Sequence, residues 1–257
     1  MGIISCNGQT FRDVQAVFID KDGTLADVAN YLSQLGYAQA QLMEDQVPGS
    51  YDIILQTLGF NDEGLTASGL LAVGSRHETV IGTAAAAAMV GCPWIQATEL
   101  AANTLKAADQ KFLPKAKYTP LLPGALDFLK RLKQTRLKII MVSADAQNNL
   151  ENFVACYGLT PYFDYLQGVS SQQPSKVDPG FLQTACHEIG ILPHQGVVIG
   201  DAASDLRMAV AARGFIGFLG GWCPQVSAAN ILPRSALGQE TLPSYTFATD
   251  FNQILLN

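Results

Sequence analysis

Three short apolar segments have the pattern of buried parallel strands, and a polar residue follows each of them. Residues 14–20, 137–142 and 196–200 are rich in Val, Ile, Leu and Phe, with few polar interruptions. Near-continuous apolar runs of this length are typical of strands that are covered on both faces. The polar groups at their carboxyl ends are Asp20, Ser143 and Asp201.

Helical patterns lie between these strands. Leucines spaced along residues 124–132 predict one helix, and residues 148–157 and 181–189 predict two more that stop at Gly158 and Gly190. Strand-like pieces recur at 214–219 and 245–249, and Asn7-Gly8 predicts a tight hairpin within residues 3–13. Strands that alternate with helices predict an α/β fold, a Rossmann-like and mostly parallel sheet with helices on both faces.

Residues 26–118 interrupt this alternation. They are rich in Ala, Leu and Gln and contain no convincing strand, so we expect several helices. We therefore predict an α/β core domain made of residues 1–25 and 119–257, and a small all-helical cap domain made of residues 26–118.

Composition narrows the class of protein. Hydrophobic residues make up 48% of the 257 residues and charged residues 15%, which allows a large core and leaves room for a homodimer interface. The net charge of −6 and the lack of a long basic cluster argue against a nucleic-acid partner. The five cysteines are isolated, and the first residues lack the basic stretch and apolar run that are expected of a signal peptide. Glycine, proline and polar residues interrupt the uncharged runs 79–98 and 214–233, so we expect no membrane span and a cytoplasmic protein.

The polar residues at the strand ends are expected to meet. Ligands of an open parallel sheet bind at the carboxyl ends of its strands, where Asp20, Ser143 and Asp201 lie. Lys176 falls at a helix start between the second and third of these strands. Each residue alone has a simpler interpretation: Asp201 and Ser143 as helix caps, and Lys176 as a solvated loop lysine. The run Asp20-x-Asp22-Gly23 is more informative, because Asp and Gly are unfavourable in a buried strand.

Four motifs in order resemble those of the haloacid dehalogenase-like (HAD) superfamily. Asp20-Lys21-Asp22-Gly23-Thr24-Leu25 is similar to the first motif, Ser143 to the second, Lys176 to the third, and Gly200-Asp201-Ala202-Ala203-Ser204-Asp205 to the fourth. The insert lies where this superfamily carries a C1-type helical cap, and the chain looks like a phosphoglycolate phosphatase. The resemblance implies a Mg²⁺-dependent phosphatase that hydrolyses small-molecule phosphate monoesters through an aspartyl-phosphate intermediate.

The resemblance also assigns roles to individual residues. Asp20 would be the nucleophile, and Asp22 the general acid and base. The metal would be bound by the carboxylates of Asp20 and Asp201 and the backbone carbonyl of Asp22, with Asp205 orienting the shell. The residues expected to contact the phosphoryl group are Thr24, Ser143, Ala144 and Lys176.

Counting the charges in the pocket that the resemblance implies also favours a metal. Four carboxylates and a phosphate dianion would share one pocket with a single lysine. Each carboxylate pair at about 4 Å costs on the order of 4 kcal/mol at an effective dielectric constant near 20. Mg²⁺ prefers carboxylate and phosphate oxygens, so it is the expected cation.

One segment of the insert is a candidate substrate contact. Ser75 and Glu78 have the spacing of a capping box, which would place Arg76 and His77 at a helix N-terminus. We hypothesise that Arg76 and His77 contact an acidic substrate such as a carboxylated phosphate. The alternative is an exposed helix start with ordinary surface residues.

The motifs also depart from the usual pattern. Lys21 stands where many relatives have an apolar or aromatic residue, the second motif reads Ser143-Ala144-Asp145, and no proline follows Lys176 directly. These departures leave alternatives open. The chain is compatible with a phosphosugar mutase or a phosphonoacetaldehyde hydrolase-like enzyme on the same scaffold. A non-catalytic HAD-like binding protein is a further alternative.

Overall fold

A computed structural model describes residues 2–169, 176, 178–222, 227–232 and 242–257. The chain forms two compact units. One consists of Met1–Asp27 and Thr119–Asn257, and the other of Val28–Tyr118.

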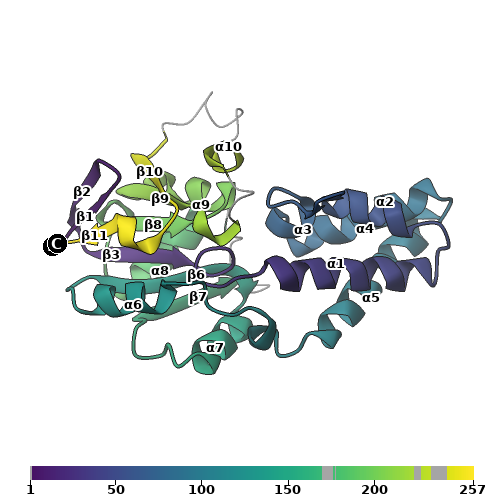
Figure 1. Cartoon of the computed structure of the whole chain (residues 1–257), viewed down its shortest axis with the longest axis horizontal. Coiled ribbons are helices and arrows are strands. Elements are labelled where there is room, and N and C mark those ends of the chain that lie inside the picture. The colour runs from purple at the N-terminus through teal and green to yellow at the C-terminus, as the bar shows by residue number, and fades with distance from the viewer. Residues whose placement is uncertain (1, 170–175, 177, 223–226, 233–241) are drawn as a thin grey trace. The chain divides into compact units, whose positions relative to one another are not determined.

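A six-stranded parallel sheet forms the centre of the first unit (Figure 1). Its order is β10-β9-β8-β3-β6-β7, and every neighbouring pair is parallel. The central strand β3 lies between β8 and β6, which both follow it in the chain. This arrangement confirms the prediction of a Rossmann-like, mostly parallel sheet. The strands are β3 (Ala16–Asp20), β6 (Lys138–Ala146), β7 (Tyr165–Val169), β8 (Gly196–Gly200), β9 (Gly214–Phe218) and β10 (Tyr245–Ala248).

Helices on the sheet bury the apolar side chains of its strands. Phe18 of β3 and Val198 of β8 share a core with Phe181 and Leu206 from the helices α8 and α9. Figure 1 shows α6 and α7 along one side of the sheet and α9 and α10 along the other. The helices are α6 (Ala125–Lys133), α7 (Gln147–Cys156), α8 (Pro179–Ile189), α9 (Ala203–Met208) and α10 (Ala228–Ile231), with short 3₁₀ turns at Pro193–Gln195, Ala209–Ala211, Gly220–Trp222 and Phe251–Gln253.

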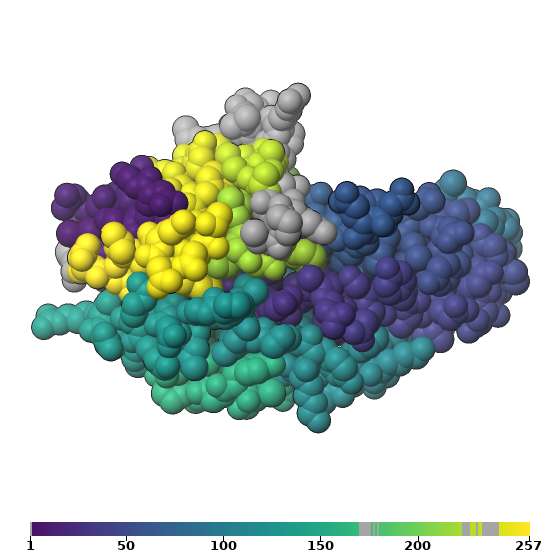
Figure 2. Space-filling view, viewed as in Figure 1, coloured from purple at the N-terminus to yellow at the C-terminus, as the bar shows by residue number. Residues whose placement is uncertain are grey.

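The two ends of the chain meet in a second, antiparallel sheet of the same unit. It has the order β11-β1-β2 and consists of β1 (Gly2–Cys6), β2 (Gln9–Val14) and β11 (Ile254–Leu256). Asn7 and Gly8 both have positive φ, at 45° and 86°, as a two-residue hairpin turn requires. The predicted hairpin is therefore confirmed. Figure 2 shows the yellow C-terminal segment beside the purple N-terminal hairpin.

The second unit is built mainly from helices. Alanines such as Ala84 and Ala97 are fully buried, which lets helix backbones approach closely. A hairpin of two-residue strands, β4 (Phe60–Asn61) and β5 (Gly64–Leu65), also lies in this unit. This hairpin was not predicted from the sequence, because strands this short leave no periodic pattern. The helices are α1 (Ala29–Glu44), α2 (Tyr51–Leu58), α3 (Leu70–Val73), α4 (Arg76–Met89) and α5 (Trp94–Lys111), followed by a 3₁₀ turn at Lys115–Tyr118.

Strand β6 is longer than the apolar run that predicted it. It continues past Val142 through Ser143 to Ala146, which pairs with Val169 of β7 after a shift in register. Ser143 is therefore a strand residue and does not cap α7. No helix among the described residues is both long and apolar enough to cross a membrane.

Three stacked aromatic rings join the C-terminal segment to the sheet. The ring of Phe251 lies 4.3 Å from that of Phe218 and 5.0 Å from that of Phe128. Arg131 donates hydrogen bonds to the carbonyl oxygens of Phe251 (2.6 Å) and Ile254 (3.1 Å). The rings and these bonds hold the chain that leads into β11.

We expect Phe251→Ala to destabilise the first unit by about 3–5 kcal/mol, because it leaves a cavity among these rings. The chain has two tryptophans, and in a Trp94→Phe background only Trp222, in the first unit, would report urea unfolding by fluorescence. Leu255→Ala is the matched control, since Leu255 is 54% exposed. Equal urea midpoints for Phe251→Ala and the control would contradict the role of the stack.

Candidate active site

A tight turn follows the central strand β3. The carbonyl oxygen of Lys21 accepts hydrogen bonds from the backbone N–H groups of Leu25 (2.9 Å) and Ala26 (2.8 Å). Gly23 has a φ of 80°, and a Cβ atom there would lie 2.1 Å from Oδ2 of Asp201. Glycine is needed at this position for both reasons, since other residues are strained at positive φ and would collide with the carboxylate.

Three carboxylates gather at the carboxyl ends of β3 and β8. Asp20 ends β3, Asp201 follows β8, and Asp205 lies in the first turn of α9. One oxygen from each lies within 4.8 Å of the others. Asp20 and Asp205 are buried, at 3% and 0% exposure, so water screens their charges little.

Lys176 provides the cation of this cluster. Its ammonium forms ion pairs with Asp20 and, at 2.7 Å, with Oδ1 of Asp205. Burial opposes the charge on Lys176, but the two carboxylates outweigh this effect and raise its pKa. The lysine is therefore held in its charged form. Lys176 is thus a buried partner of Asp20, and the simpler interpretation of it as a solvated loop lysine is wrong.

The acidic cluster is unbalanced without a further cation. Burial raises the pKa of Asp20 to about 7 despite the attraction of Lys176, and burial with the charges of Asp20 and Asp205 raises that of Asp201 well above its usual value. Three ionised carboxylates and one ammonium leave two negative charges unmatched. A divalent cation with a preference for oxygen ligands fits this donor set, and Mg²⁺ has that preference.

The side chain of Asp201 points toward the turn after β3 and does not cap a helix. Its Oδ1 accepts a hydrogen bond from Thr24 Oγ1 (3.4 Å) and its Oδ2 from Trp222 Nε1 (3.0 Å). At the start of α9 it is Asp205 that accepts from the backbone N–H of Ala202 (3.0 Å). The structure therefore contradicts the helix-cap interpretation of Asp201.

Trp222 is a site residue that the sequence analysis did not single out. It lies 7% exposed in the segment Gly220-Gly221-Trp222, which packs against the turn after β3. A Cβ atom on Gly221 would lie 1.7 Å from the carbonyl oxygen of Gly23, so only glycine fits. Two glycines before a tryptophan, directly after a predicted strand, were the signal that could have indicated a close approach.

A second group of charges lies beside the first. Lys21 is 1% exposed, and its ammonium forms ion pairs with Asp22 and, at 2.9 Å, with Asp145. The backbone N–H of Asp145 donates to Ser143 Oγ (3.1 Å), and Ser143 is 1% exposed. The neighbouring Ala144 is exposed. Asp145 therefore contacts Ser143 through its backbone and Lys21 through its side chain, and Lys21 in turn pairs with Asp22.

Arg76 and His77 belong to the other unit. The capping box that was predicted there is confirmed: Glu78 N–H donates to Ser75 Oγ (3.2 Å), and Ser75 N–H donates to Glu78 Oε2 (2.7 Å). Both Arg76 and His77 are exposed at the start of α4. Arg76 forms an ion pair with Asp109 of α5, so part of its charge is already matched.

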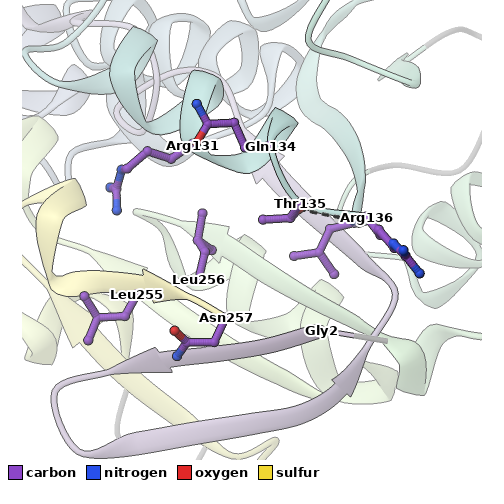
Figure 3. A pocket seen from close by; sticks show the side chains of 9 residues that line it. Gly2, Arg131, Gln134, Thr135, Arg136, Leu255, Leu256 and Asn257 are labelled. Carbon is purple, nitrogen blue, oxygen red and sulfur yellow. Dashed lines mark hydrogen bonds between the residues drawn. The ribbon is translucent and has the colours of Figure 1, made fainter.

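A cavity of about 740 Å³ in the first unit is separate from the acidic cluster (Figure 3). It lies at the amino end of β6 and beside β11, whereas Asp20 and Asp201 follow the carboxyl ends of their strands. The guanidinium of Arg131, which lines it, is already bonded to backbone carbonyl groups. None of the predicted site residues lines this cavity.

The chain matches a known protein family over most of its length. A model of the haloacid dehalogenase-like hydrolase family matches residues 14–213, which include all four motifs. The chain belongs to the haloacid dehalogenase-like hydrolase family. It is therefore an enzyme of the hydrolase class, and the resemblance of its motifs to the HAD superfamily is confirmed.

Individual HAD relatives cover most of the chain. A phosphoglycolate phosphatase of Psychrobacter arcticus is 26% identical over 76% of this chain and 78% of its own. Among solved structures, a predicted phosphoglycolate phosphatase of Haemophilus somnus has a TM-score of 0.66 at 17% identity, covering 93% of this chain and 95% of its own. A HAD family hydrolase of Deinococcus radiodurans with bound phosphate and sodium has a TM-score of 0.60 at 19% identity, covering 94% and 93%. At these identities the structures show a shared fold.

We expect Asp201→Asn to raise the melting temperature of the metal-free protein at pH 8. The raised pKa values mean that the folded state binds protons more tightly than the unfolded chain, whose Asp pKa is about 3.9. For Asp20 this stabilising contribution is complete below about pH 4 and is lost as the pH rises through about 7. The raised pKa of Asp201 acts in the same direction. Removing one charge should therefore help more at pH 8 than at pH 5.5.

The measurement is thermal unfolding with a chelator at both pH values. Asp13→Asn is the matched control, because Asp13 is an exposed carboxylate in the same unit. A loss of stability in Asp201→Asn at pH 8 would show that the acidic cluster does not repel itself.

Proposed function

We propose that this chain is a Mg²⁺-dependent phosphatase that hydrolyses small phosphate monoesters through a phosphorylated Asp20. The observation that carries the proposal is the meeting of three carboxylates with one buried lysine at the carboxyl ends of adjacent parallel strands. Membership of a hydrolase family and a phosphoglycolate phosphatase among the relatives support the same chemistry.

Asp20 is the proposed nucleophile. Its carboxylate oxygen would attack phosphorus in line with the departing alcohol oxygen, forming a new P–O bond as the ester P–O bond breaks. Lys176, already within contact of Asp20, would neutralise charge on the nucleophile and on the incoming phosphate. Ser143, Thr24 and the exposed Ala144 are the other proposed phosphate contacts.

Asp22 is the proposed proton carrier. It would give a proton to the leaving oxygen and then take one from the water that hydrolyses the phosphorylated Asp20, which returns the nucleophile and releases inorganic phosphate. The carboxylates of Asp20 and Asp201 and the backbone carbonyl of Asp22 would hold Mg²⁺, with Asp205 orienting the lysine and the shell. When bound, Mg²⁺ supplies positive charge that offsets the carboxylates and the phosphate.

The substrate is proposed to be a small phosphorylated metabolite, with the unit Val28–Tyr118 as the cap that selects it. We also propose that the enzyme works in the cytoplasm. Its assembly as a homodimer stays a prediction.

We expect Asp20→Asn to lower the Mg²⁺-dependent hydrolysis of p-nitrophenyl phosphate by at least about a thousandfold, because the amide is a poor nucleophile. Phosphate release by the wild type should also stop when a chelator removes Mg²⁺. Asp13→Asn controls for the removal of a remote carboxylate. Full activity of a folded Asp20→Asn protein would exclude the phosphorylated Asp20.

A panel of phosphorylated metabolites would separate the proposed phosphatase from the other reactions on this scaffold. A phosphatase releases inorganic phosphate, a phosphosugar mutase yields an isomer, and a phosphonate-cleaving enzyme breaks a C–P bond. A protein that binds panel members without turning them over would indicate a non-catalytic relative.

We expect Arg76→Ala to raise KM for 2-phosphoglycolate several-fold and to leave KM for p-nitrophenyl phosphate within about twofold, since only the former has a carboxylate. His77→Ala is expected to act in the same direction. Lys111→Ala removes an exposed cation from the same unit and is the control. An unchanged KM across the panel for both Arg76→Ala and His77→Ala would leave these residues as surface positions.

A further inference from the structure

Lys21 has an environment that the reaction outlined above does not explain. It stands between the proposed nucleophile Asp20 and the proposed proton carrier Asp22, and it is 1% exposed. A buried ammonium is costly unless carboxylates or other acceptors replace its water. Its position in the first motif therefore calls for a specific set of partners.

The structure supplies those partners from three segments. The ammonium of Lys21 forms ion pairs with Asp22 in the turn after β3 and with Asp145 of β6, at 2.9 Å. It also lies over the ring of Phe153 of α7, 5.3 Å from the centroid, which favours a cation. Asp145 has a further contact with Asn149 Nδ2 at 3.4 Å. The lysine is thus held at a defined place between a strand, a helix and the turn.

The two buried lysines serve different carboxylates. Lys176 pairs with Asp20 and Asp205, whereas Lys21 pairs with Asp22 and Asp145. Among the described residues, the group of carboxylates close enough to share a cation consists of Asp20, Asp201 and Asp205, without Asp22. The Asp22 carboxylate is thus paired with Lys21 and lies outside that group, whose negative charges would repel it.

We propose that Lys21, itself fixed by Asp145 and Phe153, is a positioning residue that holds the carboxyl group of Asp22 in place for proton transfer. This inference rests on the proposed phosphatase function and extends it to the Lys21–Asp145 pair. Proton transfer needs the donor and acceptor atoms within about 3.2 Å, so a small displacement of Asp22 slows it. Lys21 touches neither substrate nor metal in this role and acts through Asp22.

Leaving groups of different basicity give a readout that a purely structural role would not affect. A p-nitrophenolate ion departs without a proton, whereas an alkoxide needs one from Asp22. The rate of leaving-group release in a single turnover, with Mg²⁺ present, isolates this step. The two substrates are p-nitrophenyl phosphate and 2-phosphoglycolate, or the alkyl phosphate that the wild type hydrolyses fastest in the panel.

Lys21→Met keeps the length and apolar stem of the side chain but removes its charge. We expect the release of the alkyl alcohol to slow by roughly 10- to 100-fold, which is part of the usual contribution of general acid catalysis. The release of p-nitrophenolate should slow by less than about threefold, because this leaving group needs no proton. KM for the alkyl phosphate should stay within about twofold. Lys21→Arg, which keeps the cation, should restore part of the lost rate.

Asp145→Asn gives a second, independent variant in case Lys21→Met folds poorly. It should show the same selective loss, and adding it to Lys21→Met should cause little further loss, because both changes release the same residue. Lys138→Met is the matched control, since Lys138 is an exposed lysine of β6 that pairs with Asp164. It should leave both rates unchanged.

Two other outcomes would overturn the inference. Equal losses with both substrates, in step with a lower melting temperature, would show that Lys21 only supports the fold. Unchanged or faster alkyl release would show that Asp22 needs no positioning by Lys21. A wild type that is inactive on every phosphate ester would instead refute the proposed function, which keeps the two failures distinct.

Discussion

The crowding of carboxylates at the carboxyl end of β3 is the constraint on which the site depends. Asp20, Asp201 and Asp205 meet in a buried place where charges repel strongly, and Lys176 offsets only part of their charge. Such an arrangement is costly for a folded protein and is typical of functional sites. The surrounding structure must therefore hold the acids together against their repulsion.

The sheet supplies that support. Because β3 lies between β8 and β6, Asp20 and Asp201 lie at one edge of the sheet, although they are far apart in the sequence. Ser143 lies at the same level of the sheet, since its neighbour Val142 pairs with Asp20. The segment Gly220–Trp222 then contacts both neighbouring parts of the site: Gly221 closely approaches Gly23 in the turn after β3, and Trp222 donates a hydrogen bond to Asp201 after β8. The sheet and the close backbone contact between Gly23 and Gly221 thus hold carboxylates of like charge near one another.

Two buried lysines pair with different carboxylates of the site. Lys176 pairs with Asp20 and Asp205, which belong to the cluster of carboxylates that could hold a cation, and Lys21 pairs with Asp22 and Asp145. Lysine is a compact charge on a flexible stem, so it can reach a buried position between two carboxylates. An apolar residue at position 21 would remove this ion pair with Asp22.

The sequence by itself determined five strands of the central sheet, the N-terminal hairpin, the mainly helical insert and the four motifs, because burial on both faces and turn chemistry leave local patterns. It did not predict the edge strand β7, the short strand β11 or the small hairpin of β4 and β5. Asp20 and Asp201 could be expected at one edge since parallel strands share a direction. Only the tertiary structure decided the contacts of Lys21, Asp145 and Trp222, and the extension of β6 beyond Ser143. Such contacts join residues from distant segments, and no local pattern records which buried charge will meet which carboxylate.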